Sequence, residues 1–291
     1  MRIGELHRPP SKIHRGDAEP PLNPEPMLVT ARGRKKQGER AVGTTFVLIH
    51  GTWHGGWAWR DVVHHLSKRG HIAHAPTLAG HGPGAMCNRV THQRCVESVV
   101  ACIRDNDLEN VVLVGHSFGG TVVQKVAEEA PDRIARMVFL DALILQDNER
   151  VFDVLPDVFL ASLAAKNGNN PAAMSLEKTN GIFPIPPWET WRDNFIQDAP
   201  ESLALSTWEQ LSPEPSQVNF DNIHLKSFYS LAIPKSFIFC RQDKAMPPGY
   251  FHPRMSSRLG AFKLLEMDGS HEVMFTRPAG LAEEIVEASS E

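Results

Sequence analysis

A serine within a glycine-flanked pentapeptide, GHSFG at residues 115–119, is the strongest candidate for chemistry in the chain. The pattern G-x-S-x-G is typical of a serine held on a sharp turn that joins a strand to a helix. The context fits, because the apolar run at 111–114 predicts a strand before the turn and the valine spacing after it predicts a helix over 118–130. Ser117 is therefore a candidate nucleophile.

A serine hydroxyl needs a base to remove its proton, and a histidine oriented by an acid is the usual solution. After a turn of this kind the order along the chain is serine, acid, histidine. His224 precedes the fifth predicted strand, and His252 falls in a predicted helix after that strand. His271 follows the sixth predicted strand, in a loop at the edge where Ser117 is expected, so we predict that His271 is the base.

Two aspartates are candidates for the acid. Asp243 follows the predicted strand at 236–240, and Asp141 follows the one at 137–140, so both lie at carboxyl ends of strands. Asp268 is close to His271 in sequence, but neighbours in a short loop rarely face each other. Placement favours Asp243 and leaves Asp141 as the alternative.

A tetrahedral intermediate needs two N–H donors for its oxyanion. Phe118, directly after the candidate nucleophile, supplies one, and the glycine-rich loop at 50–56 supplies the other, for which we predict Thr52. The loop lacks the G-x-G-x-x-G and GKS/GKT patterns of phosphate-binding loops. Trp53 and His54 in this loop are candidates to contact substrate, although His54 could equally be bonded into the loop backbone.

Short apolar runs alternate with helical patterns along most of the chain. Strands are predicted at 46–49, 71–78, 111–114, 137–140, 236–240 and 262–267, and helices at 59–66, 91–103, 118–130 and 278–288. This alternation predicts an α/β fold, with a mostly parallel sheet of about six strands and helices on both faces. Such a sheet carries its functional residues at the carboxyl ends of the strands.

Two stretches depart from this alternation. Residues 1–42 hold six prolines, many charges and little apolar periodicity, and we expect a flexible tail there. Residues 43–291 then form one domain. Within it, about 146–234 show helical fragments and several tryptophans but no alternation, which predicts a cap inserted over the sheet. Five aromatic residues of this insertion are equally candidates for the pocket wall and for the cap's own core: Phe183, Trp188, Trp191, Phe195 and Trp208.

Composition limits the partners. A net charge of −4 offers no general attraction to nucleic acid or to anionic membranes, and no apolar run approaches the ~20 residues of a membrane helix. The four cysteines show neither zinc-ligand spacing nor a disulfide framework, so we expect no metal site and a reducing, cytoplasmic location. A small-molecule substrate is the expected partner.

Three stretches together resemble the α/β-hydrolase superfamily: FVLIHGTWHGGWAW at 46–59, GHSFG at 115–119 and GSHEVMFTRP at 269–278. They are most similar to the branch of plant methylesterases, hydroxynitrile lyases and small bacterial ester and carbamate hydrolases. The resemblance implies a helical cap, no cofactor, and a triad of Ser117, Asp243 and His271. The branch places its acid before a proline-containing turn, which fits Asp243 in DKAMP.

The same resemblance separates hydrolysis from lyase chemistry. The lyases carry a threonine after the first histidine of the loop and a lysine after the catalytic histidine, where this chain has Gly51 and Glu272. We therefore expect cleavage of a small carboxylic ester through an acyl-enzyme. Amide or carbamate hydrolysis by the same triad, lyase-like chemistry and non-catalytic binding of a small molecule are the alternatives.

Overall fold

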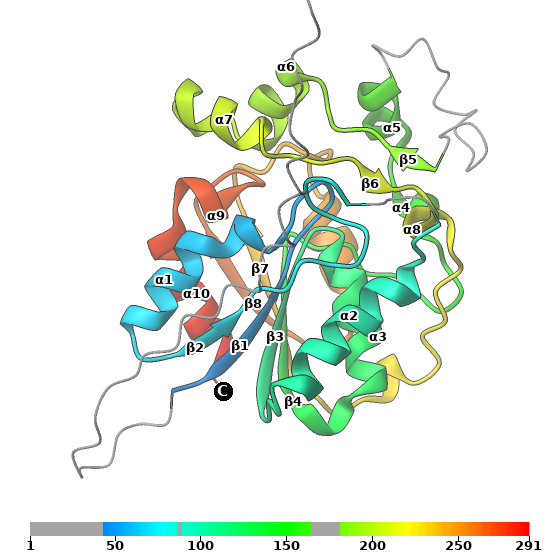
Figure 1. The fold of residues 1–291 in the computed structure, drawn as a ribbon, viewed down its shortest axis with the longest axis vertical. Helices are drawn as coiled ribbons and strands as arrows, with labels where there is room; N and C mark the ends of the chain where they lie inside the picture. Colours follow the sequence, from blue (N-terminus) through cyan, green and yellow to red (C-terminus); the bar gives the residue numbers. More distant parts are fainter. Residues whose placement is uncertain (1–42, 86–88, 165–180, 291) are drawn as a thin grey trace, which may run out of the picture.

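Six parallel strands form the centre of the computed structural model, which describes residues 43–85, 89–164 and 181–290 (Figure 1). The strands are β1 (Thr45–Ile49), β2 (Ile72–His74), β3 (Val111–His116), β4 (Ile134–Leu140), β7 (Lys235–Cys240) and β8 (Lys263–Met267). They lie in the order β2-β1-β3-β4-β7-β8, and every neighbouring pair is parallel. The predicted fold class is confirmed. The predicted tail at 1–42 lies outside the described residues.

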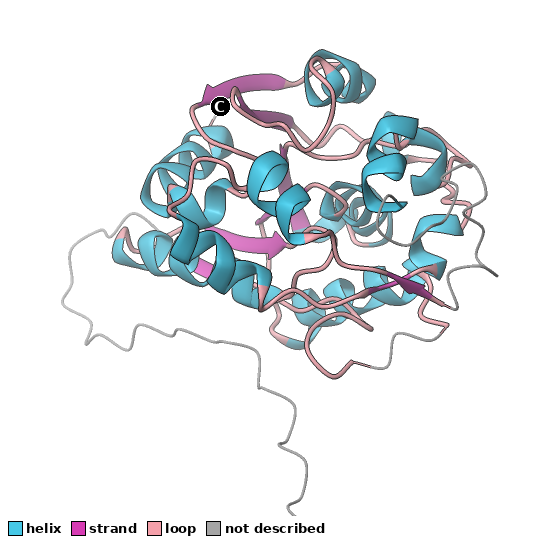
Figure 2. Ribbon diagram, turned by 90° about the horizontal axis from the view of Figure 1, so that it is seen from above, coloured by secondary structure: helices cyan, strands magenta, loops and turns pink. Residues whose placement is uncertain are grey.

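Each strand contributes to two cores because its side chains alternate between the faces of the sheet. In β1, Val47 and Ile49 pack on one face, and Phe46 and Leu48 pack on the other. The first core is covered by α2 (His92–Asp105) and α3 (Gly119–Glu129), and the second by α1 (Arg60–Lys68) and α10 (Pro278–Ser289). Figure 2 shows the strands from above with helices on both sides.

The helices on the sheet begin where the sequence indicates. Thr91 is the N-cap of α2, and its side chain accepts a hydrogen bond from the Arg94 N–H at 3.3 Å. The remaining short elements of the α/β core are η1 (Gly56–Trp59), η2 (Pro131–Arg133), η7 (Tyr250–Met255), η8 (Ser256–Leu259) and α9 (Val273–Thr276). Within the described residues, no helix has the length and apolar character to cross a membrane.

The second strand is shorter than expected, because β2 spans three residues instead of 71–78. It is an edge strand, and Pro76 has no N–H to donate to a neighbour. The chain beyond it bonds to the loop after β1 instead. The Leu78 N–H donates to His50 Nε2 at 3.0 Å, and the Thr77 hydroxyl accepts from the Gly56 N–H at 2.9 Å.

Most of the insertion between β4 and β7 lies over the carboxyl edge of the sheet, at the top of Figure 1, and its last part returns beside α3. Its elements are α4 (Val151–Val154), α5 (Asp157–Ala164), β5 (Ile182–Phe183), α6 (Trp188–Thr190), η5 (Trp191–Phe195), α7 (Glu201–Trp208), β6 (Glu214–Pro215), α8 (Gln217–Phe220) and η6 (Phe228–Ser230). The cap is mainly helical, as expected, and β5 and β6 add a small antiparallel sheet to it. Strands of two residues are too short to show a period in the sequence.

Candidate active site

Ser117 occupies a sharp turn between β3 and α3, with a positive φ of 52°. This left-handed conformation is strained for a residue with a side chain. Both flanking glycines are sterically required. A Cβ at Gly119 would lie 2.7 Å from the carbonyl oxygens of Ile49 and His50, and one at Gly115 would lie 2.6 Å from a methyl group of Val123. The pentapeptide therefore packs the serine turn tightly against β1 and the start of α3.

His271 and Asp243 form a buried pair at the same edge of the sheet. His271 Nδ1 lies 2.6 Å from Asp243 Oδ2, and both side chains are almost fully buried. Burial alone would lower the pKa of His271, but the charge of Asp243 and the hydrogen bond to it outweigh that effect and raise the pKa. His271 and Ser117 line one pocket, so the structure brings the serine and the predicted base to the same cavity.

Asp141, the alternative acid, lies behind this pair. Its carboxyl group accepts the N–H of Cys240 at 3.1 Å, while Asp243 contacts the imidazole. The polar atoms of the two aspartates and His271 lie within 4.8 Å of one another, a separation that would also suit a metal ion. The short His271–Asp243 bond instead engages both partners as a hydrogen-bonded pair. Asp141 therefore lies behind Asp243, and it is Asp243 that bonds to the imidazole.

The loop after β1 lies directly against the serine turn. A Cβ at Gly51 would lie 3.1 Å from Cβ of Ser117, so a glycine lets the two segments approach. Thr52 lines the pocket, and Phe118 follows Ser117 at the start of α3. The N–H groups of Thr52 and Phe118, the predicted oxyanion donors, donate to no other residue in the described part of the chain. Both are available to a ligand.

Two further histidines hold these loops, and no pattern in the sequence indicates their roles. His116 Nε2 donates to the carbonyl oxygen of His271 at 3.0 Å, which ties the base loop to β3. His50 donates through Nδ1 to the Gly51 carbonyl and accepts the Leu78 N–H at Nε2. Burial lowers the pKa of both rings well below the usual value, so both are neutral structural groups.

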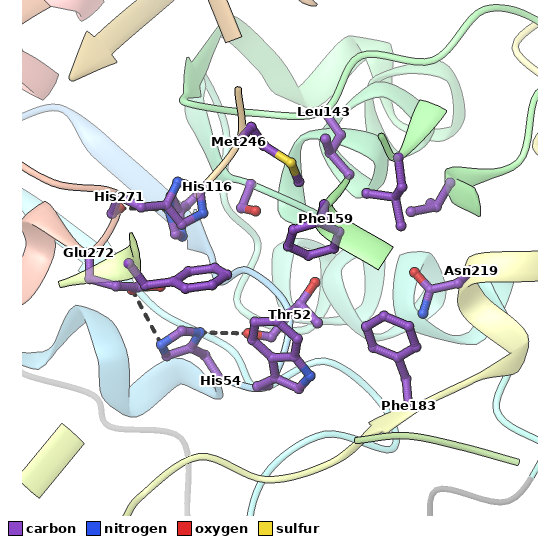
Figure 3. A pocket seen from close by; sticks show the side chains of 15 residues that line it. Thr52, His54, His116, Leu143, Phe159, Phe183, Asn219, Met246, His271 and Glu272 are labelled. Carbon is purple, nitrogen blue, oxygen red and sulfur yellow. Dashed lines mark hydrogen bonds and ion pairs between the residues drawn. The ribbon is translucent and has the colours of Figure 1, made fainter. Parts of the chain in front are cut away.

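His54 fulfils both of the interpretations left open by the sequence. Its Nδ1 donates to the Thr52 carbonyl oxygen at 2.7 Å, and the ring also lines the pocket (Figure 3). Its Nε2 lies 3.4 Å from a carboxyl oxygen of Glu272. Burial lowers the pKa of His54 to about 3 and raises that of Glu272 to about 8, so this contact joins two neutral groups rather than two ions.

The pocket wall combines the loops that carry the candidate catalytic residues with side chains of the cap. Its lining residues are Thr52, Trp53, His54, His116, Ser117, Leu143, Val151, Leu155, Phe159, Phe183, Phe195, Asn219, Met246, His271 and Glu272. The candidate aromatic residues divide between the two roles. Phe183 and Phe195 line the pocket, as does Trp53, which stacks on Phe183. The Trp191 indole N–H instead donates to a carbonyl inside the cap, and Trp188 packs on Trp208.

A serine on a strand-to-helix turn, a buried His–Asp pair at the next strand ends and a cap over a parallel sheet define the α/β-hydrolase class. The sequence model of the alpha/beta hydrolase family matches residues 46–284, and the chain belongs to that family. An extracellular alpha/beta-hydrolase from a Paenibacillus species is similar in structure, with 38% identity and a TM-score of 0.77 over 85% of this chain and 100% of that one. It is described as sharing structural and functional homology with tobacco salicylic acid-binding protein 2.

Two curated relatives are similar in sequence. A carbendazim hydrolyzing esterase of Nocardioides is 37% identical over 144 residues, which cover 48% of this chain and 60% of that protein. A putative chloroplastic methylesterase 15 of Arabidopsis thaliana is 26% identical over 298 residues, which cover 97% of this chain and 64% of that protein. The chain therefore spans less than two thirds of the length of either relative.

Proposed function

We propose that the protein is a serine hydrolase that cleaves a small carboxylic ester through an acyl-enzyme intermediate. The observation that carries this proposal is the shared pocket, which is lined by Ser117 on its strained turn and by His271, whose imidazole is bonded to Asp243 at 2.6 Å. The esterase and methylesterase activities named for the two curated relatives support the same reaction class.

The first half of the reaction forms the acyl-enzyme. His271 Nε2 takes the proton of Ser117 as the serine oxygen attacks the ester carbonyl. The negative charge that develops on the carbonyl oxygen accepts hydrogen bonds from the N–H groups of Thr52 and Phe118. Asp243 stabilises the imidazolium and holds the tautomer that leaves Nε2 facing the serine. The imidazolium then returns the proton to the departing alcohol.

The second half repeats these steps with water as the nucleophile. His271 deprotonates the water, which attacks the acyl carbonyl, and the proton then passes to Ser117 as the acid leaves. The chain's own residues supply every proton-transfer group in this scheme, which requires no cofactor. Amide or carbamate cleavage by the same residues is the neighbouring alternative. The cytoplasmic location expected from cysteine usage stays a prediction.

Covalent labelling with a fluorophosphonate tests the proposal directly. We expect modification of the tryptic peptide that contains Ser117, together with turnover of p-nitrophenyl acetate, and loss of both in Ser117→Ala. The exposed Ser206 of α7 provides a matched control, because Ser206→Ala removes a hydroxyl outside the pocket and should label as the parent protein does. Folded protein that neither labels at Ser117 nor turns over any ester would refute the proposal.

A further inference from the structure

Asn219 is a polar residue of the pocket wall that the proposed mechanism does not use. It lies in α8 of the cap, is 2% exposed and lines the same pocket as Ser117 and His271. Figure 3 shows its side chain across the pocket from His271. Its position is therefore suited to contact with a part of the substrate that is distant from the scissile bond.

The orientation of the Asn219 amide is fixed by Glu214, whose side chain is fully buried. Asn219 Nδ2 donates to Glu214 Oε1 at 2.7 Å, and Glu214 Oε2 lies 3.3 Å from His81 Nε2. His81 Nδ1 is committed to the carbonyl oxygen of Ala79, which can only accept.

Two proton arrangements are compatible with the contact between His81 and Glu214. Either an imidazolium donates to a carboxylate, or a protonated Oε2 donates to a neutral ring. In both arrangements Oε1 of Glu214 is an acceptor. The amino group of Asn219 must therefore face Glu214, and its carbonyl oxygen must point the other way.

That other direction is the pocket, as Figure 3 shows for the oxygen of Asn219. No residue in the described part of the chain donates to Asn219 Oδ1. The neighbouring walls are apolar and include Leu155, Phe159 and Phe183. A buried acceptor that faces an apolar cavity is costly unless a donor meets it, so the partner must come with water or with the ligand.

We propose that Asn219 is a specificity-determining residue that selects esters carrying an O–H or N–H donor at the end remote from the scissile bond. The carbonyl oxygen of Asn219 accepts this donor, while the apolar walls hold the ring or chain between the donor and the ester. This inference rests on the proposed ester hydrolysis and names the class of substrate for that same site.

The first test uses the unaltered protein and methyl esters of phenylacetic acids that carry a hydroxyl, amino or methyl group at ring position 3 or 4. These groups are similar in size, but the methyl group has no donor. At the ring position that reaches Asn219, we expect kcat/KM for the hydroxyl or amino ester to exceed that of the methyl ester by about tenfold, the effect of leaving a buried acceptor unpaired. Equal values for donor and methyl esters at both positions would overturn the assignment.

Variants test whether Asn219 is the residue that causes the preference for donor esters. Asn219→Leu should make kcat/KM for the donor ester equal to that for the methyl ester. Asn219→Ser should do the same, and its smaller side chain leaves room for a water molecule that can donate to Glu214 in place of the amide, which guards against misfolding caused by an unpaired carboxylate. Asn222→Leu makes the same chemical change at an exposed position three residues away and should preserve the ratio of donor to methyl ester.

The outcomes separate the two proposals. Ester turnover that needs Ser117 but shows no dependence of the ratio on Asn219 overturns only the role of Asn219. Absence of both ester turnover and Ser117 labelling removes the proposed function, and the substrate class falls with it.

Discussion

Two buried carboxyl groups lie together behind the imidazole of His271. Burial, the charge of Asp243 and a hydrogen bond to it raise the pKa of Asp141 well above its usual value. Asp141 therefore holds a proton and leaves the negative charge on Asp243, since two adjacent carboxylates rarely ionise together. The charge is thus concentrated on the group that contacts His271 Nδ1.

This arrangement predicts a specific effect of Asp243→Asn. We expect kcat to fall by about 10³–10⁴-fold, because an amide does not hold the productive tautomer of the imidazole. The carboxylate that raises the pKa of His271 is also lost, so the acid limb of the residual kcat/KM profile should move to lower pH. A pH–rate profile measures both effects.

The companion variant Asp141→Asn separates the two aspartates. It preserves the bond between His271 and Asp243, so its loss of kcat should be much smaller than that of Asp243→Asn. A larger loss in Asp141→Asn would show that the acid is Asp141 and would contradict the geometry described above.

At the scale of elements, the close approach of α3 to β1 depends on Gly119. A methyl group there would meet two backbone carbonyl oxygens at 2.7 Å, and backbone yields less readily than a side chain. Gly119→Ala should therefore lower the free energy of unfolding by about 1–3 kcal/mol, the usual cost of overpacking.

Gly280 in α10 offers a control, because an added Cβ there would lie in open space. Gly280→Ala is the control and should raise stability by about 0.5–1 kcal/mol, as alanine does in helices. Urea denaturation measures both, and equal destabilisation would contradict this account.

The sequence predicted the elements of the sheet because apolar runs and helical stripes are local signals. The site predictions rest on strand ends, because the carboxyl ends of parallel strands place Ser117 and His271 at one edge of the sheet. Placement could favour Asp243 over Asp141 but could not show which carboxylate contacts the imidazole. The features that the sequence does not predict depend on contacts between residues far apart in the chain. Asn219 owes its orientation to Glu214, whose other carboxyl oxygen contacts His81 well over a hundred residues away, and nothing in the local sequence marks that contact.

At the scale of the whole molecule, the cap is joined to the α/β core by polar contacts as well as by apolar packing. The Ser212 N–H donates to the Trp53 carbonyl at 2.9 Å, and the Gly82 N–H donates to the Ser212 hydroxyl at 3.2 Å. Arg258 forms a bidentate pair with Glu149 at 2.7 and 3.0 Å. These directional contacts fix the cap over the pocket and so keep Asn219 and the catalytic loops in one relative position.

The buried carboxyl of Glu272 links the stability of the whole fold to pH. Burial is the main cause that raises its pKa from the usual 4.5 to about 8, so the folded protein retains a proton that the unfolded chain releases. Stability from this group is therefore fully present below pH 4.5 and is lost as the pH rises to about 8. We expect Glu272→Gln, which cannot ionise, to gain stability relative to the parent protein across this interval, by up to about 1.4 kcal/mol per pH unit.

Chemical denaturation at several pH values between 5 and 8 measures this difference in the free energy of unfolding between Glu272→Gln and the parent protein. The exposed Glu209 of the cap provides a control for the loss of one negative charge, as Glu209→Gln. A constant offset between Glu272→Gln and the parent protein over this range would show that the folded protein carries Glu272 ionised, and would contradict a neutral contact with His54.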